Sequence, residues 1–239
     1  MSVTDHDTVA GLDESERAAR ASGIAFVPGI EITAVNERRD VHVLGYFIDR
    51  HSDELAAFLE RQRAERVRRV LEMADKLAHM GKPIDRDAVL ARRSGTSVGR
   101  PMVAKALVKA GHVADVRQAF EQLIGEGKPA FTFRRGPSPS DAIGIINRAG
   151  GIASLAHPGL LKRDELIPGM IEAGLTAVEC FHSDHDAAAT EHYVAFADRH
   201  GILVSGGSDY HCDKERRKAA FGTIGLPQEH FDRLKARIK

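Results

Sequence analysis

The sequence predicts an α/β protein in which short buried strands alternate with helices and form a parallel sheet or a closed barrel. Three observations support this fold class. Short apolar runs alternate with amphipathic stretches, residues 53–127 are helical in pattern throughout, and histidine or acidic residues follow several of the apolar runs. A chain of 239 residues is long enough to bury such a core and to carry an inserted segment as well.

Residues 1–50 supply the first part of the predicted barrel. The strands expected there cover residues 2–4, 24–32 and 41–48. A helix is expected over residues 9–21, because Thr8 is a suitable N-cap and the residues that follow are amphipathic.

Residues 51–128 are predicted to form a helical insertion that caps the barrel. A charged amphipathic helix covers residues 53–79, and Arg100-Pro101 begins a later helix. Basic residues outnumber acidic ones in this segment although the whole chain is neutral. A solvated helix face is the default explanation for arginines such as Arg66 and Arg69.

The alternation of strands and helices resumes in residues 129–239, the second part of the barrel. The expected strands cover residues 130–133, 152–156, 177–181 and 202–205, and the expected helices cover residues 140–149, 165–173 and 187–200. Residues just beyond the carboxyl ends of barrel strands line the active site in proteins of this class.

Composition excludes several classes of protein. With 34 basic and 34 acidic residues, the chain has no global field that would attract nucleic acid or a membrane surface. Cys180 and Cys212 lack the spacing of a metal or redox motif and suggest reduced thiols. The sequence contains no apolar run of about 20 residues that could span a membrane. We therefore expect a cytoplasmic protein with no membrane partner.

Six metal-type residues follow short apolar runs at similar places in the pattern. They are His6, Glu31, His42, His157, Asp209 and His211. Any one of them has a structural explanation, but their joint position at strand ends favours a binuclear or trinuclear hydrolase centre. Asp209 and His211 form an extended i, i+2 pair with both side chains on one side, and Glu31 in an apolar strand end is costly unless it is paired or metal-bound.

At these residues the sequence resembles the polymerase and histidinol phosphatase (PHP) family, in the branch of 3',5'-nucleotide phosphatases and 5'-3' exoribonucleases. The matching segments are Thr4-Asp5-His6-Asp7-Thr8, Gly29-Ile30-Glu31, His42-Val43-Leu44-Gly45, Gly99-Arg100-Pro101, Ala149-Gly150-Gly151, Ala156-His157-Pro158-Gly159 and Gly207-Ser208-Asp209-Tyr210-His211. The resemblance implies a distorted seven-stranded (β/α) barrel with the helical segment over the mouth of the site.

The resemblance also implies up to three neighbouring sites for Mn²⁺, Zn²⁺ or Fe²⁺. Glu31, His42 and His157 would hold one ion, Glu31 would bridge to a second near Asp209, and His6 and His211 would hold the third. The family pattern also includes an earlier strand with a His-x-His pair, which this sequence lacks. Either the true chain begins further upstream, or the protein is a truncated member. A missing strand would leave an open sheet edge that favours self-association.

The expected chemistry needs no serine or cysteine nucleophile. Two or three divalent ions clamp the phosphate and lower the pKa of a bridging water, whose hydroxide attacks phosphorus. Asp5 and Asp7 either orient the ligands or cap the following helix. The candidate substrate-binding residues are Arg100, Arg134, Arg135, His182 and His185, with Arg100 at a helix start where phosphate can bind.

Two functions from different classes follow from this pattern. The first is a metal-dependent phosphoesterase that acts on phosphorylated small molecules, nucleotides or short RNA ends. The second is a catalytically impaired metal-binding or scaffold protein that keeps the barrel without its first strand. A proofreading module of a polymerase is a weaker third reading.

Overall fold

The computed structural model describes residues 1–91, 98–211 and 221–238. Its centre is a six-stranded sheet in which neighbours follow the order of the chain. The strands are β1 (Ser2–Val3), β2 (Val27–Asn36), β3 (Arg39–Tyr46), β4 (Ile152–Leu155), β5 (Ala177–His182) and β6 (Leu203–Gly207). The described residues thus form a six-stranded α/β sheet of the expected class.

The sheet is mixed, which corrects the expectation of a purely parallel one. β1 and β2 are parallel to each other, and β4, β5 and β6 are parallel to one another. β3 runs antiparallel to both of its neighbours, β2 and β4. The cause is a hairpin: β3 pairs with β2 along its whole length, from Tyr46 opposite Gly29 to Arg39 opposite Asn36. Only Glu37 and Arg38 connect them, and both have positive φ angles, of 48° and 70°. A two-residue connection reverses the chain, whereas parallel neighbours need a long crossover.

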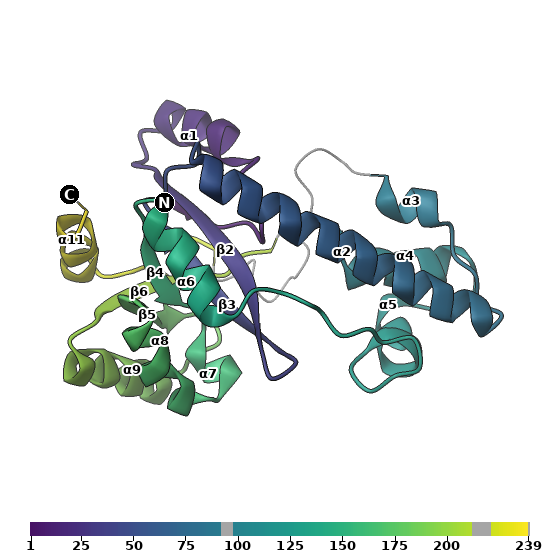
Figure 1. Ribbon diagram of the computed structural model, residues 1–239. Helices are drawn as coiled ribbons and strands as arrows, with labels where there is room; N and C mark the ends of the chain where they lie inside the picture. The colour runs from purple at the N-terminus through teal and green to yellow at the C-terminus, as the bar shows by residue number, and fades with distance from the viewer. Residues whose placement is uncertain (92–97, 212–220, 239) are drawn as a thin grey trace.

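Helices pack around the sheet and complete its core (Figure 1). They are α1 (Leu12–Ala21), α6 (Pro139–Arg148), α7 (Pro158–Leu161), the 3₁₀ turn η2 (Asp164–Leu166), α8 (Ile167–Glu172), α9 (Ala187–His200) and α11 (Gln228–Ala236). The first helix begins three residues later than expected, because the Thr8 hydroxyl accepts a hydrogen bond from the Ala10 amide and closes a turn before the helix. α6 begins with a capping box between Ser138 and Asp141.

The segment between β3 and α6 is helical and has a hydrophobic cluster of its own. It contains α2 (Asp53–His79), α3 (Arg86–Leu90), α4 (Arg100–Lys109), α5 (Val116–Ala119) and a π-helical turn, η1 (Phe120–Ile124). The first turns of α2 pack on the main core through Leu55 and Phe58, whereas Met73 and Leu77 belong to the second cluster. α2 therefore runs from the sheet out to the other helices of the segment (Figure 1). The boundaries of the inserted cap stay a prediction.

The strand expected over residues 130–133 is wrong. Residues 131–138 form a connector that is not part of a strand, and its backbone bond to the sheet is the one that the Val35 amide of β2 donates to the Pro137 carbonyl over 2.8 Å. At residues 131 and 132, two α2 side chains take the place of a strand neighbour: Lys76 donates to the carbonyl of Phe131, and Arg69 Nε donates to the carbonyl of Thr132 over 2.8 Å. These bonds satisfy backbone carbonyls that a sheet neighbour would otherwise pair.

None of the described helices is long and apolar enough to cross a membrane. Of the two cysteines, Cys180 is buried with a free thiol. Cys212 lies outside the described residues.

Candidate metal centre and substrate pocket

The β2–β3 hairpin brings Glu31 and His42 to one face of the sheet. Thr33 lies opposite His42 in the ladder, and Glu31 shares the face of Thr33 because the two are separated by one residue. His157 follows β4, the neighbour of β3. Glu31 Oε1 consequently lies 2.7 Å from His42 Nδ1 and 3.5 Å from His157 Nε2, and the two ring nitrogens lie 3.2 Å apart.

The second oxygen of Glu31 faces His6. The loop after β1 is held beside β2, because the Asp7 amide donates to the Glu31 carbonyl over 2.9 Å and the Glu31 amide donates to the Asp5 carbonyl over 3.2 Å. His6 Nδ1 lies 3.6 Å from Glu31 Oε2 as a result. Ligand atoms of His6, Glu31 and His42 all lie within 4.8 Å of one another. A carboxylate with different imidazoles at its two oxygens can bridge two cations.

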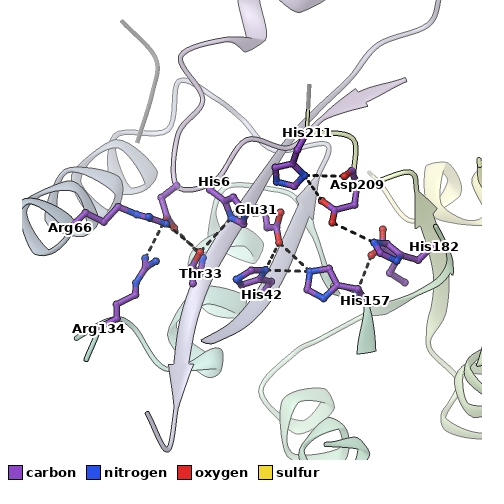
Figure 2. A network of polar contacts seen from close by, with 12 residues as sticks. His6, Glu31, Thr33, His42, Arg66, Arg134, His157, His182, Asp209 and His211 are labelled. Atoms are coloured by element: carbon purple, nitrogen blue, oxygen red, sulfur yellow. Dashed lines mark hydrogen bonds and ion pairs between the residues drawn. The ribbon is translucent and has the colours of Figure 1, made fainter. Parts of the chain in front are cut away.

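Asp209 and His211 join this group from the loop after β6 (Figure 2). His211 Nδ1 lies 3.3 Å from Asp209 Oδ1, and its ring centre lies 5.9 Å from that of His6. Asp209 has a positive φ of 47°, a strained conformation for a residue other than glycine. The structure thus brings together all six residues that the sequence proposed as metal ligands. We call His6, Glu31, His42, His157, Asp209 and His211 the candidate metal centre.

The donor set of the candidate metal centre suits a divalent cation. Glu31 is only 5% exposed. Its burial opposes ionisation, but the His157 and His42 imidazoles outweigh that effect and hold the pKa of its carboxyl well below the usual range. Glu31 Oε1 and His157 Nδ1 are buried and have no well-directed hydrogen bond to any described residue. An ionised carboxylate among imidazoles at close range, with polar atoms unsatisfied, fits hard or borderline cations such as Mn²⁺, Zn²⁺ and Fe²⁺.

His182 and His185 take different positions. His182 is 3% exposed, and its Nε2 points to Asp209 Oδ2 at 3.6 Å, so this histidine lies at the edge of the centre. His185 instead spans two backbone groups: its Nδ1 donates to the Cys180 carbonyl over 2.9 Å, and its Nε2 accepts from the Gly159 amide over 3.2 Å. Both ring nitrogens of His185 are therefore occupied by structural bonds.

Glu179 is a buried residue of the site that the sequence analysis missed. It lies on β5, and its Oε2 accepts a hydrogen bond of 2.9 Å from the amide of His157. His157 has a φ of 29°, so this bond helps to hold a strained backbone in place. Burial raises the pKa of Glu179 to about 7. The argument that selected Glu31, an acidic residue inside an apolar strand, would also have found Glu179.

Asp7 connects the centre to the helical segment. It accepts hydrogen bonds from Arg66 Nε of α2 and from Arg134 Nη2 of the connector, each over 2.9 Å, and from the Thr33 amide over 3.0 Å. The side chains of Arg66 and Asp7 are 16% and 0% exposed. Arg66 is therefore part of a buried ion network, which corrects the expectation of a solvated helix face. The alternative role as a helix cap is not seen, because α1 begins after Gly11 without a side-chain cap, and the orienting role of Asp7 stays a prediction.

An open pocket of about 550 Å³ adjoins His42 and His157. Five arginines and two carboxylates line it, namely Arg38, Arg39, Arg69, Arg100 and Arg134 with Asp40 and Glu126. We call it the arginine pocket. Arg100 begins α4 after Gly99, and its guanidinium lies 5.7 Å and 5.8 Å from the ring centres of Phe120 and Phe131. Arg135 is exposed and does not line the pocket, in contrast to Arg134.

Comparison with known proteins agrees with this geometry. No family model matches the chain. The chain is 33% identical over 235 residues to the 3',5'-nucleoside bisphosphate phosphatase of Chromobacterium violaceum. The aligned residues cover 95% of this chain and 82% of that protein. The chain is 39% identical over 158 residues to a 5'-3' exoribonuclease of Haemophilus influenzae, covering 66% of this chain and 57% of that one.

Two solved structures share the fold closely. One is described as a metal-dependent phosphoesterase from Bifidobacterium adolescentis, with a TM-score of 0.85 and 32% identity over 99% of this chain and 85% of the other. The second is described as an amidohydrolase from Chromobacterium violaceum with bound sulfate, with a TM-score of 0.81 and 32% identity over 100% of this chain and 86% of the other. With the buried Glu31 among histidines beside an arginine pocket, these likenesses establish that the chain belongs to the PHP family of metal-dependent phosphoesterases, in the branch of nucleotide phosphatases and 5'-3' exoribonucleases.

Proposed function

We propose that this phosphoesterase hydrolyses phosphate esters of nucleotides or of short RNA ends. The observation that carries the proposal is the contact between the candidate metal centre and the arginine pocket, which share His42 and His157. A phosphate at the centre would have a cluster of guanidinium groups beside it for the rest of an anionic substrate. The names of the similar phosphatase and exoribonuclease support a nucleotide or RNA substrate.

The metal roles are part of this proposal. Glu31, His42 and His157 would hold one ion, Glu31 with Asp209 a second, and His6 with His211 a third, as Mn²⁺, Zn²⁺ or Fe²⁺. Bound ions of this kind supply a water activated as a nucleophile and neutralise charge on the phosphate. Glu179 would keep His157 oriented toward the centre through its backbone bond.

Arg100 and Arg134 would bind substrate phosphate from the walls of the pocket. His182 would contact the phosphate from the edge of the centre, whereas Arg135 and His185 have weaker support as substrate-binding residues. The seven-stranded barrel with its first strand also stays a proposal, since the described residues form six strands. Self-association through a sheet edge and a cytoplasmic location likewise remain predictions.

The test is an assay of phosphate release by the purified chain with Mn²⁺, Zn²⁺ or Fe²⁺. Substrates are adenosine 3',5'-bisphosphate, short 5'-phosphorylated RNA and glycerol phosphate. We expect hydrolysis of the first two and loss of it on treatment with EDTA. The His157→Ala variant should be inactive, and His51→Ala, which changes an exposed histidine outside the candidate metal centre and the arginine pocket, should match the wild type. Metal binding without hydrolysis of any ester would favour the impaired scaffold instead.

A further inference from the structure

An aromatic pair stands at the outer edge of the arginine pocket. Phe131 lines the pocket, and its ring meets that of Phe133 edge to face, with centres 5.0 Å apart. Phe133 is 42% exposed, so part of its ring is open to solvent and to a ligand. The Arg38 guanidinium, which also lines the pocket, lies 4.9 Å from the Phe133 ring centre. We call Phe131, Phe133 and Arg38 the aromatic rim.

The connector that carries both rings is held in place from α2. Lys76 and Arg69 donate to the carbonyls of Phe131 and Thr132, so both peptide groups between the two phenylalanines are held by α2. Arg69 also lies 5.6 Å from the ring centre of Phe131. The connector is therefore held in place before any ligand arrives, which reduces the conformational entropy that the protein would lose on binding.

Arg38 reaches the rim from a strained turn. Glu37 and Arg38 form the two-residue tip of the β2–β3 hairpin, where glycine or asparagine is favoured because both φ angles are positive. Glu37 Oε2 accepts from Arg163 Nη2 over 3.2 Å, which fixes the tip against the segment after α7. A strained backbone retained at a turn that carries a pocket-lining arginine points to function.

We propose that the aromatic rim is a stacking subsite for a nucleobase of the substrate. The proposal rests on the proposed function, since it names how the base is recognised while the phosphate lies at the candidate metal centre. An exposed phenylalanine face accepts any base by stacking, and a guanidinium across it adds a cation–π contact. The neighbouring arginines would hold phosphate of the same nucleotide. A sugar phosphate without a base would leave the aromatic faces unused.

A binding test can be made without catalysis, because the chain contains no tryptophan. The F133W variant places a single indole in the rim, and its fluorescence is titrated with adenosine 3',5'-bisphosphate in EDTA. We expect saturable quenching, and much weaker quenching by the same sugar bisphosphate without a base. M80W, which places an indole at an exposed site after α2, is the control for absorption by the ligand. Equal responses of F133W and M80W would overturn the proposal.

A kinetic test measures selectivity with the same pair of compounds. For Phe133→Ala, the ratio of kcat/KM for the nucleotide to kcat/KM for the abasic compound should fall roughly 5- to 150-fold, the range for one base–aromatic stack. Phe133→Tyr keeps a ring of the same face and should retain the ratio, and Met80→Ala should leave it unchanged.

The outcomes separate the two proposals. Equal losses on both compounds would show that Phe133 acts only on the fold, and the stacking subsite would be wrong although the phosphoesterase function stands. If the wild-type chain cleaves neither compound, the proposed function fails, and the F133W titration still decides whether a base stacks at the rim.

Discussion

The candidate metal centre and the arginine pocket share two histidines, yet they are held by different physical means. Glu31 and His42 lie in the ladder of β2 and β3, where backbone pairing fixes each residue. The arginines of the pocket extend from α2, α4, the hairpin tip, the first residue of β3 and the connector, and Arg69 donates a hydrogen bond to the Thr132 carbonyl. The central carboxylate of the metal centre and its nearest imidazole therefore rest on paired strands, whereas recognition rests mostly on long side chains from helices and connecting segments.

This difference predicts two kinds of variant. Substitutions in the centre should remove the reaction itself, because they act where charge develops in the transition state. Substitutions in the pocket should mainly weaken substrate binding, because they act on groups that contact the ground state and the transition state alike.

The largest effect is expected for Glu31→Gln. Glutamine has nearly the same shape as glutamate but lacks the negative charge. In Glu31 that charge faces His6 at one carboxylate oxygen and His42 and His157 at the other. We expect kcat to fall by at least about 10³-fold, comparable to or beyond the loss of a main electrostatic group at other active sites. Metal content, measured by elemental analysis, should fall in parallel. Glu172→Gln changes an exposed glutamate of α8 and serves as the control. A Glu31→Gln enzyme with full metal content and near-normal kcat would contradict the bridging role.

Asp7 lies at the junction between the candidate metal centre and the arginine pocket. The next largest effect is expected for its replacement by alanine, which should lower the free energy of unfolding. Asp7→Ala leaves Arg66 and Arg134 partly buried without their counter-charge, which should cost about 3–5 kcal/mol of unfolding free energy. Burial opposes ionisation of the Asp7 carboxyl, but Arg66 and Arg134 outweigh that effect and lower its pKa. Chemical denaturation measures the change, with Glu60→Ala as the control because the Glu60–Arg63 pair on α2 is exposed.

A cycle with Arg66→Met tests the coupling directly. If the free energy of unfolding changes additively in Asp7→Ala, Arg66→Met and the double variant, the two residues are independent and the junction is misassigned.

Local patterns were sufficient to predict which six side chains lie close together in the candidate metal centre. His157 and the Asp209–His211 pair follow apolar strands directly, and parallel strands carry such residues to one edge of a sheet. A charged amphipathic pattern likewise predicted the long helix over residues 53–79, and the structure has α2 at these bounds, with the Ser52 side chain accepting from the Leu55 amide at its start. Both predictions depend on neighbours in the sequence.

Other features depend on contacts between distant segments, and the sequence did not reveal them. Residues 130–133 have the composition of a strand, but the carbonyls of Phe131 and Thr132 accept hydrogen bonds from side chains of α2 rather than from a neighbouring strand. Arg66 reads as a surface residue on a helix wheel, yet its partner Asp7 is 59 residues away. The reversal of β3 depends on a Glu-Arg turn that lacks the glycine or asparagine typical of such hairpins.

A smaller effect on the centre is expected for Glu179→Ala. The variant removes the acceptor for the His157 amide and should lower metal affinity about 10- to 100-fold, as loss of a group that orients a ligand does elsewhere. Glu179→Gln keeps an acceptor oxygen and should recover most of that affinity. Isothermal titration of the metal-free chain with Mn²⁺ measures both. Equal affinities for the alanine and glutamine variants would show that Glu179 does not act through this bond.

The smallest effect is expected for Arg100→Ala, and it tests the pocket side of the comparison. The Arg100 guanidinium rests between Phe120 and Phe131 and would donate charge-assisted hydrogen bonds to substrate phosphate. Losing that contact should raise KM roughly 10-fold and leave kcat within about a factor of three, the pattern of uniform binding.

Arg135→Ala is the matched control for that measurement. Arg135 is an exposed arginine near the pocket that does not line it, so its loss should change neither constant. Steady-state phosphate release at varied nucleotide concentration gives both values. If Arg100→Ala lowers kcat strongly at unchanged KM, Arg100 acts on the transition state, and the division between a catalytic sheet and a recognising helical segment breaks down at this residue.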